Sequence, residues 1–297
     1  VAQNGCRDSV TKQVTVLESP VAKFAINDPS QCQNEQEFII TDQSTIQNDT
    51  ISQNLWILGT DTTTNTKQRT LNNLQPGTHN LHLIAQTSKN CTDTATHQLT
   101  VHPSPVASIQ VNDTVQCFNE QNFKITDLST VPNDTFSQNL WIINTDTTQN
   151  KEQQTLNNLQ PGAHNLHLIA ITSKGCTDTT SQQLSVLSSP KAAISINDPS
   201  QCHNEQEFII TDQSTIQNDT ITQNLWIIGT DTTRNKEQRT MNNLQPGTLN
   251  LHLIALTSQG CPDTASKQIT VHPSPEANFS INDSTQCLDS NNFKFSN

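Results

Sequence analysis

The chain has 297 residues and a net charge of −12 at neutral pH, with 31% hydrophobic and 4% aromatic residues. The acidic balance, without any basic cluster, argues against binding to nucleic acid or to an anionic membrane surface. So few apolar residues exclude one large core and favour several small domains, and the lack of an apolar run of about 18 residues argues against membrane insertion of this segment.

One unit of sequence recurs every 85 residues. A proline opens each copy at Pro20, Pro105, Pro190 and Pro275, and a tryptophan recurs at Trp56, Trp141 and Trp226. We therefore expect three complete repeats at 20–104, 105–189 and 190–274. They lie between the C-terminal part of a preceding repeat at 1–19 and the N-terminal part of a following one at 275–297. We interpret the sequence as a window on a longer array with short, proline-stiffened linkers.

Within each repeat, apolar residues alternate with polar ones, and Asn, Asp, Gly and Pro separate the alternating runs, which predicts β-strands. In the first expected strand, Phe24 is apolar in every copy, whereas Lys23 is not. In the second, Phe38 and Ile40 stay apolar, whereas Ile39 becomes Lys124. Since successive strand residues face opposite sides, the positions that stay apolar should face the core.

The second half of each repeat continues this pattern. A strand contains Trp56, a Pro-Gly turn precedes a strand with Leu81 and Leu83, and the last strand contains Leu99 and Val101. About seven short strands in roughly 85 residues predict an antiparallel β-sandwich with one core tryptophan. No segment has the periodicity of an amphipathic helix.

Several motifs recur together in the repeat: Trp56 with Gly59-Thr60-Asp61, Pro76-Gly77, Cys91-Thr92-Asp93-Thr94 and the joining sequence LTVHPSPVA. Together they resemble the PKD domain, and most of all the tandem PKD-type repeats of giant Bacteroidetes cell-surface proteins such as gliding-motility adhesins. The resemblance spans essentially the whole chain. It departs from the family where Gly59 becomes Asn144 and where His79 replaces a tyrosine.

The resemblance implies an all-β fold of tandem antiparallel immunoglobulin-like (PKD-like) β-sandwiches in a linear array. It also implies secretion across the outer membrane to the cell surface, and no enzyme. We expect a structural and adhesive segment of a very large adhesin or filament, acting as a stiff disulfide-stapled rod. Alternatives are a polysaccharide-binding array, whose sign would be an exposed aromatic platform, and a spacer in a secreted hydrolase.

Eight cysteines alternate at intervals of 26 and 59 residues. Their even number and regular spacing in an exported chain favour disulfides, and no Cys-x-x-Cys points to zinc. Family topology implies that Cys32 and Cys91 lie at opposite ends of one sandwich, too far apart for a disulfide. It therefore favours pairs between repeats, Cys32–Cys176 and Cys117–Cys261. Pairs within repeats remain the alternative: Cys32–Cys91, Cys117–Cys176 and Cys202–Cys261.

The dipeptide Asp-Thr recurs throughout the chain and resembles the O-glycosylation sequon of exported Bacteroidetes proteins. The implied glycosylation sites are Thr50, Thr62, Thr94, Thr114, Thr147, Thr179, Thr220, Thr232 and Thr264. The alternative is that Asp and Thr are ordinary turn residues whose side chains bond to their own backbone.

Other candidate chemistry is weak. His79 and His82 are three residues apart on a strand and should face opposite sides, so they cannot share a metal. No nucleophile elbow or glycine-rich loop occurs, so we expect no catalytic site, metal or cofactor. Each repeat junction carries one carboxylate that could bind Ca²⁺, but one is too few, and a solvated loop is the better interpretation. These carboxylates are Asp28, Asp113, Asp198 and Asp283.

The tryptophan strand has apolar residues on both faces. Those expected to point outward form a contact stripe together with an isoleucine on the neighbouring strand: Leu55, Ile57, Ile84, Ile142, Ile169, Ile227 and Ile254. Exposed apolar patches often mark contacts, so the stripe predicts lateral self-association or adhesion, beside the contacts between neighbouring repeats. The alternative is that loops or glycans cover it.

Overall fold

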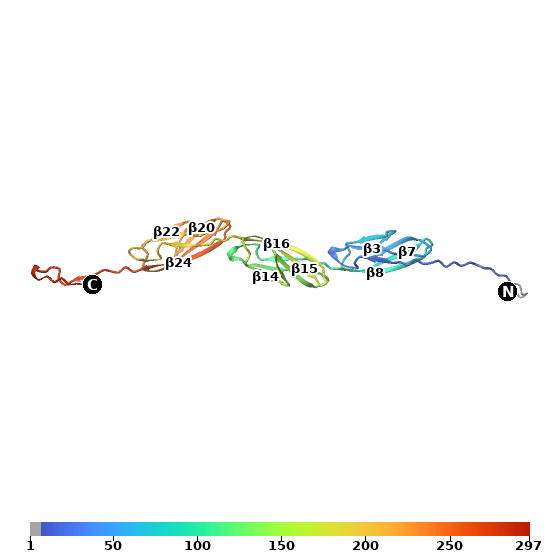
Figure 1. Cartoon of the computed structure of the whole chain (residues 1–297), viewed down its shortest axis with the longest axis horizontal. Helices are drawn as coiled ribbons and strands as arrows, with labels where there is room; N and C mark the ends of the chain where they lie inside the picture. Colours follow the sequence, from blue (N-terminus) through green and yellow to red (C-terminus); the bar gives the residue numbers. More distant parts are fainter. Residues whose placement is uncertain (1–6) are drawn as a thin grey trace. The chain divides into compact units, whose positions relative to one another are not determined.

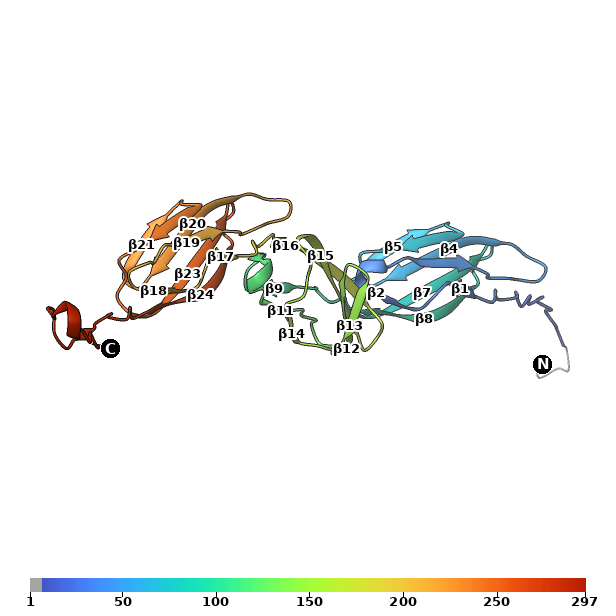
Figure 2. The same ribbon diagram turned by 60° about the vertical axis from the view of Figure 1, so that its left-hand side comes forward.

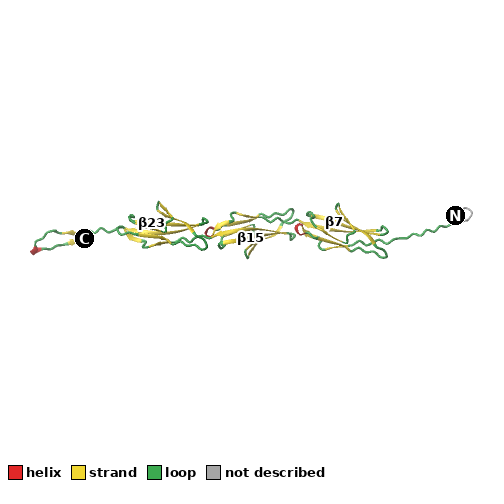
Figure 3. Cartoon of the chain, turned by 90° about the horizontal axis from the view of Figure 1, so that it is seen from above, coloured by secondary structure: helices red, strands yellow, loops and turns green. Residues whose placement is uncertain are grey.

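A computed structural model describes residues 7–297 of the chain. Over these residues the fold is all-β, with strands and only three one-turn 3₁₀ helices (Figure 3). The same order of strands recurs in each complete repeat, so that the first repeat describes the others (Figure 1).

The first repeat is a sandwich of two sheets. Its elements are β1 (Phe24–Ile26), β2 (Ser30–Cys32), η1 (Gln33–Glu35), β3 (Phe38–Asp42), β4 (Ile51–Leu58), β5 (Asp61–Thr64), β6 (Gln68–Leu71), β7 (Gly77–Thr87) and β8 (Thr92–His102). One sheet has the order β1-β3-β6, and the other has the order β2-β8-β7-β4-β5. Figure 2 shows β4, β5, β7 and β8 side by side. Only the β2–β8 pair is parallel in this repeat.

This strand order is immunoglobulin-like, because the first strand changes sheets and the two sheets are otherwise antiparallel. The sequence pattern predicted about seven strands, and the repeat has eight. The additional strand arises at Asn27-Asp28-Pro29, where the chain leaves the β1 sheet and begins β2 on the other one.

The second repeat contains β9 (Ile109–Val111), β10 (Val115–Cys117), η2 (Phe118–Glu120), β11 (Phe123–Asp127), β12 (Phe136–Ile143), β13 (Asp146–Gln149), β14 (Gln153–Leu156), β15 (Gly162–Thr172) and β16 (Thr177–Leu187). The third contains β17 (Ile194–Ile196), β18 (Ser200–Cys202), β19 (Phe208–Asp212), β20 (Ile221–Ile228), β21 (Asp231–Arg234), β22 (Gln238–Met241), β23 (Gly247–Thr257) and β24 (Pro262–His272). Both have the two sheet orders of the first repeat.

The two end segments are less regular. Residues 7–19 match the last strand of a repeat in sequence, but they form no strand. The C-terminal segment contains β25 (Ser280–Ile281), η3 (Leu288–Ser290) and β26 (Phe295–Ser296), and β25 pairs with β26.

By contacts between Cα atoms the chain divides into two compact units. The first contains the described residues up to Gln110 with Ile125–Gln154 and Asn165–Gln182, and the second contains Val111–Lys124, Thr155–His164 and Gln183–Asn297. The division passes through the second repeat. Each unit therefore contains one whole sandwich and the part of the second repeat that adjoins it.

Each core is built around its tryptophan. In the first repeat Trp56 is fully buried together with Phe38, Leu81 and Leu83, as the alternation predicted. The ring of Phe24 meets the Trp56 ring edge-on with centroids 5.2 Å apart, a favourable aromatic geometry. Trp141 and Trp226 are buried to the same degree in the other repeats.

The recurring Pro-Gly has a backbone reason. Gly77 enters β7 with φ of +136°, a conformation that residues with a side chain rarely adopt. Asparagine supplies the left-handed turns, for example at Asn65 and Asn73, because its short side chain tolerates positive φ. The high asparagine content of the chain is therefore partly a requirement of its turns.

Candidate functional site: the junction between repeats

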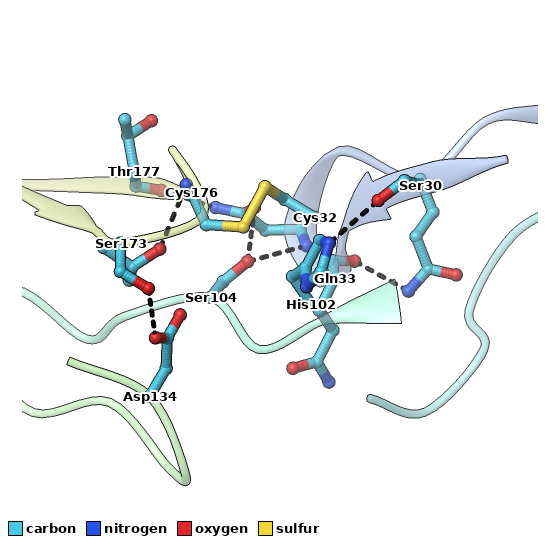
Figure 4. The surroundings of a disulfide bond; sticks show 12 residues. Ser30, Cys32, Gln33, His102, Ser104, Asp134, Ser173, Cys176 and Thr177 are labelled. Atoms are coloured by element: carbon cyan, nitrogen blue, oxygen red, sulfur yellow. Dashed lines mark hydrogen bonds between the residues drawn. A yellow bond between two sulfur atoms is a disulfide. The ribbon is translucent and has the colours of Figure 1, made fainter. Parts of the chain in front are cut away.

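Two disulfides join consecutive repeats. Cys32 bonds to Cys176 and Cys117 bonds to Cys261, in both cases with 5.5 Å between the Cα atoms and a sequence separation of 144 residues. Each disulfide lies inside one of the two compact units. These are the pairs between repeats that the family topology favoured, and the first is drawn in Figure 4.

The alternative pairs within repeats, Cys32–Cys91, Cys117–Cys176 and Cys202–Cys261, do not form. The reason lies in the register of β2 on β8, which places Cys32 beside His102 at the end of β8. Cys91 precedes Thr92 at the start of that strand. At about 3.3 Å per residue, the distance along β8 from Cys91 to His102 is roughly 35 Å, and Cys32 therefore lies far beyond the reach of a disulfide to Cys91.

Hydrogen bonds accompany the first disulfide. In η1, the Asn34 side-chain amide donates to the carbonyl of Thr177, which directly follows Cys176 (Nδ2 to O, 2.9 Å). The linker residue Ser104 accepts from the Asn34 backbone N–H at 3.1 Å and donates to its side-chain oxygen at 2.6 Å. In the second repeat the N–H of Asn119 donates to Ser189 in the same way. One turn thus fixes both the disulfide and the linker.

The hairpin that carries the second cysteine is locally braced. The N–H of Cys176 donates to Thr172 Oγ1 at 3.2 Å, and the N–H of Thr172 donates to the Cys176 carbonyl at 2.9 Å. Ser173 Oγ donates to the Asp134 carboxylate at 2.7 Å (Figure 4). This bond, followed by the N–H of Thr135, lowers the pKa of Asp134 below its ordinary value, because both donors stabilise the ionised form.

The linkers are anchored by aspartates of the Asp-Thr motif. Asp93 Oδ2 accepts the N–H of Ala22 at 2.8 Å. This bond joins the last strand of the first repeat to the start of the same repeat, just after the linker that precedes it. The corresponding pairs are Asp178 with Ala107 and Asp263 with Ala192. Sequence reasoning missed this role, although the recurrence of Asp at these positions was a signal for it.

Sequence reasoning also missed a glutamine that recurs in every complete repeat. Gln36 accepts from the Leu74 N–H and donates to the Leu74 carbonyl, both at 2.7 Å. Gln121 and Gln206 bond in the same way to Leu159 and Leu244. The pair fixes the loop before the Pro-Gly turn, which lies beside the next linker.

The candidate glycosylation sites lie on the surface. Thr114 is half-buried, and the others are exposed: Thr50, Thr62, Thr94, Thr147, Thr179, Thr220, Thr232 and Thr264. Several neighbouring aspartates have structural partners, because Asp49 accepts from Thr50 and Ser88, and Asp61 pairs with Arg69. The Asp of the motif therefore has structural roles, whereas most of its threonines are accessible for modification.

The residues of the contact stripe are half-buried on the outer face of the five-stranded sheets. Leu55 lies opposite Ile84, and the equivalent pairs recur at Leu140–Ile169 and Leu225–Ile254. Threonines occupy the adjoining cross-strand positions, with Thr94 opposite Ile84 and Thr62 opposite Ile57. The stripe is therefore a row of partly covered apolar side chains bordered by hydroxyl groups.

No group of three or more His, Cys, Asp and Glu suited to a metal ion occurs among residues 7–297. The junction carboxylate of Asp28 accepts the N–H of Ser30 at 2.9 Å, as expected for a turn. His79 bonds to the Gln75 carbonyl and His82 to Thr96 Oγ1. Among the described residues no helix is long and apolar enough to cross a membrane.

A groove lies at the junction of the second and third repeats, inside the second compact unit. Its volume is about 440 Å³, and Phe118, Gln160, Lys191 and Gln217 are among the residues that line it. Phe118 is 38% exposed. The first repeat has Gln33 and the third has His203 at this position, so the phenylalanine ring is specific to the second repeat among the three complete ones.

No protein-family model matches the chain, and no curated protein matches it. Solved structures with similar folds include the fibronectin(III)-like modules of Clostridium thermocellum CbhA (14% identity, 56% of this chain and 95% of that chain covered, TM-score 0.30). Others are extracellular domains 3–5 of Drosophila OTK (9%, 87% and 100%, 0.34) and a Ca²⁺-stabilised adhesin with which an Antarctic bacterium binds ice (10%, 90% and 77%, 0.31).

Proposed function

We propose that the chain is a load-bearing, adhesive repeat segment of a very large extracellular cell-surface protein, of the PKD-like kind found in Bacteroidetes gliding-motility adhesins. Its role in this proposal is mechanical rather than catalytic. The observation that carries the proposal is the arrangement of the two disulfides, whose loops overlap along the sequence. The disulfides and the polar, acidic surface also favour an extracellular location.

The overlap limits how far the chain can be stretched. The disulfides join Cys32 to Cys176 and Cys117 to Cys261. Each disulfide is a fixed point of the chain, and three backbone segments connect the two disulfides. The shortest segment runs from Cys117 to Cys176 (176 − 117 = 59 residues). At about 3.5 Å per extended residue, the two points cannot separate beyond about 210 Å even if every repeat unfolds. Without disulfides the limit would be about 800 Å for the 229 residues between Cys32 and Cys261 (261 − 32 = 229).

Adhesion is assigned to the contact stripe. Its side chains are half-buried in the isolated chain, so a partner surface would remove additional apolar area from water in every repeat. The exposed threonines around it are sites where O-glycans would set how closely a partner approaches. The same face supports two partners, a second copy of the array or a surface polysaccharide.

Adhesion of cells that display the protein tests both parts of the proposal. Removing the disulfides with Cys32→Ser and Cys117→Ser should leave attachment at rest unchanged but cause detachment at lower shear. Ile57→Lys with Ile142→Lys and Ile227→Lys should weaken attachment at rest by about tenfold or more, because each of these half-buried side chains would lose about 1 kcal/mol of apolar burial against a partner. Matched lysines at exposed Thr60, Thr145 and Thr230 should have no effect. Unchanged adhesion in both cysteine and stripe variants would contradict the proposal.

A second candidate function is polysaccharide binding at the groove of Phe118. An exposed aromatic ring beside amide, hydroxyl and ammonium groups is suited to stacking on a sugar and bonding to its hydroxyls. Phe118→Ala should weaken binding in a panel of soluble polysaccharides by about tenfold to a hundredfold. Phe136→Ala, at a phenylalanine that is 40% exposed elsewhere on the second repeat, is the matched control. Equal binding by wild type and both variants would argue for a purely structural array.

A further inference from the structure

Three of the described cysteines, Cys91, Cys202 and Cys287, have no disulfide partner, and the first two lie in complete repeats at disulfide positions. Cys91 lies in the β7–β8 hairpin, at the position that Cys176 and Cys261 hold in the following repeats. Cys202 ends β18, at the position that Cys32 and Cys117 hold in the preceding repeats. In the two complete junctions a hairpin cysteine always bonds to a cysteine of the other kind, at the end of the second strand. We call these two kinds the hairpin cysteine and the strand-end cysteine.

The Cys91 hairpin already has the geometry of the bonded ones. The N–H of Cys91 donates to Thr87 Oγ1 at 3.2 Å, and the N–H of Thr87 donates to the Cys91 carbonyl at 2.9 Å. The distances at Cys176 are the same. Asn90 supplies the positive φ that Gly175 supplies in the second repeat. The neighbouring Ser88–Asp49 bond corresponds to Ser173–Asp134.

The turn after Cys202 is preformed in the same sense. The N–H of Asn204 donates to Ser274 Oγ at 3.1 Å, as the N–H of Asn34 does to Ser104 beside the first disulfide. Ser274 Oγ in turn donates to the side-chain oxygen of Asn204. The side-chain amide of Asn34 donates to the Thr177 carbonyl. Asn204 has the equivalent side chain, oriented by its two hydrogen bonds with Ser274.

What differs is exposure. Cys176 and Cys261 are fully buried, whereas Cys91 is half-buried. Cys32 and Cys117 are half-buried, whereas Cys202 is exposed. Each unpaired cysteine is therefore more exposed than its bonded counterpart, which the neighbouring repeat covers. The turn and the hairpin already have the hydrogen bonds of their bonded counterparts, so neither cysteine needs a local rearrangement to form a disulfide.

We propose that Cys91 and Cys202 are halves of further junctions, each completed by another repeat of this kind in the same chain. Cys91 takes the strand-end cysteine of a repeat that precedes it, and Cys202 takes the hairpin cysteine of a repeat that follows it. Cys287, which is exposed and directly precedes η3, holds the corresponding position in the sequence, although no strand ends at it in the structure. The same chain is the source because both existing disulfides join consecutive repeats at one fixed separation, and tethering raises the effective concentration of the partner.

The chemistry needs an oxidant. The two thiols lose two protons and two electrons and form one S–S bond, while a disulfide oxidant accepts them and becomes two thiols. The inference does not depend on adhesion, because it rests on the hydrogen bonds and exposure of Cys91 and Cys202 and not on what the array binds.

Completed junctions would make the array almost inextensible. A hairpin cysteine precedes the next strand-end cysteine by 26 residues, as from Cys91 to Cys117 (117 − 91 = 26) and from Cys176 to Cys202 (202 − 176 = 26). When every junction is bonded, the cysteine that ends one 26-residue segment is bonded to the cysteine that begins another segment two repeats later. For example, Cys117 ends the segment that starts at Cys91, and it bonds to Cys261, which begins the segment that ends at Cys287. Two repeats could then extend to at most about 90 Å, against about 600 Å for their full length of 170 residues (2 × 85 = 170).

Nonreducing peptide mapping of the native protein tests this, after its free thiols are alkylated. The Cys91 and Cys202 peptides should appear only as disulfides, each joined within one chain to a cysteine of the opposite kind. Recovery of either as an alkylated thiol, linked to a small thiol, paired with its own kind or linked between two chains would overturn the inference.

A variant tests the register directly. Cys202→Ser should expose one new alkylatable thiol, at a hairpin cysteine of another repeat, while Cys32–Cys176 and Cys117–Cys261 stay intact. Cys32→Ser is the positive control, because it must expose Cys176. Thermal unfolding of both variants checks that the sandwiches remain folded. If Cys202→Ser exposes no thiol while Cys32→Ser exposes Cys176, the inference fails.

Discussion

Stretching the oxidised chain by its two ends should release far less length than stretching the reduced chain. Between Cys32 and Cys261 we expect a limit of about 210 Å when both disulfides are present and about 800 Å after reduction, from 59 and 229 residues. Single-molecule force spectroscopy measures this difference of about 600 Å directly. The reduced chain should also show a separate release for each 85-residue repeat, each up to a full extended length of about 300 Å.

Variants with one disulfide provide a sharper control. If only Cys117–Cys261 remains, the path from Cys32 to Cys261 contains 85 residues (117 − 32 = 85), and the limit rises only to about 300 Å. If only Cys32–Cys176 remains, the path again contains 85 residues (261 − 176 = 85). Removing either disulfide should therefore raise the length limit by about 90 Å, and removing the remaining one should raise it by about a further 500 Å. Equal steps would contradict the overlapping arrangement.

How much of this could be predicted from the sequence follows from the range of each interaction. Alternation within a strand is local, so it predicted the burial of Phe38, Ile40 and Leu83 and the partial exposure of Ile39. Comparison of the copies sharpened it, because a position that becomes lysine in one copy cannot face the core. The sheet change between β1 and β2 left no signal in the alternation, since it occurs at a turn.

Interactions between distant residues were predicted only where topology supplied the missing geometry. The disulfide pairs needed the positions of both strand ends, which spacing alone did not give. The bond from Ala22 to Asp93 spans 71 residues and uses a backbone donor, which leaves no mark on the residue type at position 22. The contact stripe stays a prediction. Its residues are half-buried, and the threonines that lie opposite them are visible only in the strand register.

The largest effect on stability should follow replacement of the buried tryptophan. Trp56→Ala removes a fully buried ring, its edge contact with Phe24 and a 2.9 Å bond from Nε1 to the Thr66 carbonyl. Such truncations cost about 3–5 kcal/mol, a large part of the stability of about 4–13 kcal/mol expected for 85 residues. We expect the first repeat to lose hydrogen-exchange protection while the other two keep theirs. Ile57→Ala, at a half-buried outward position, should cost about 1 kcal/mol, and full protection of the first repeat in Trp56→Ala would contradict the core assignment.

Trp56→Ala also distinguishes the stability of the first repeat from its share of an applied force, because its effect should differ between the reduced and the oxidised chain. Cys32 lies beside His102 in the folded first repeat, so this repeat holds its own backbone segment short between the two disulfides. The segments through the second and third repeats run in parallel with it, because all three join the same two points. In the reduced chain the repeats are in series, and Trp56→Ala should produce an early release of about 300 Å. In the oxidised chain the same release should vanish, since the other two segments still carry the load. An early release in the oxidised chain would mean that the disulfides do not share load between repeats.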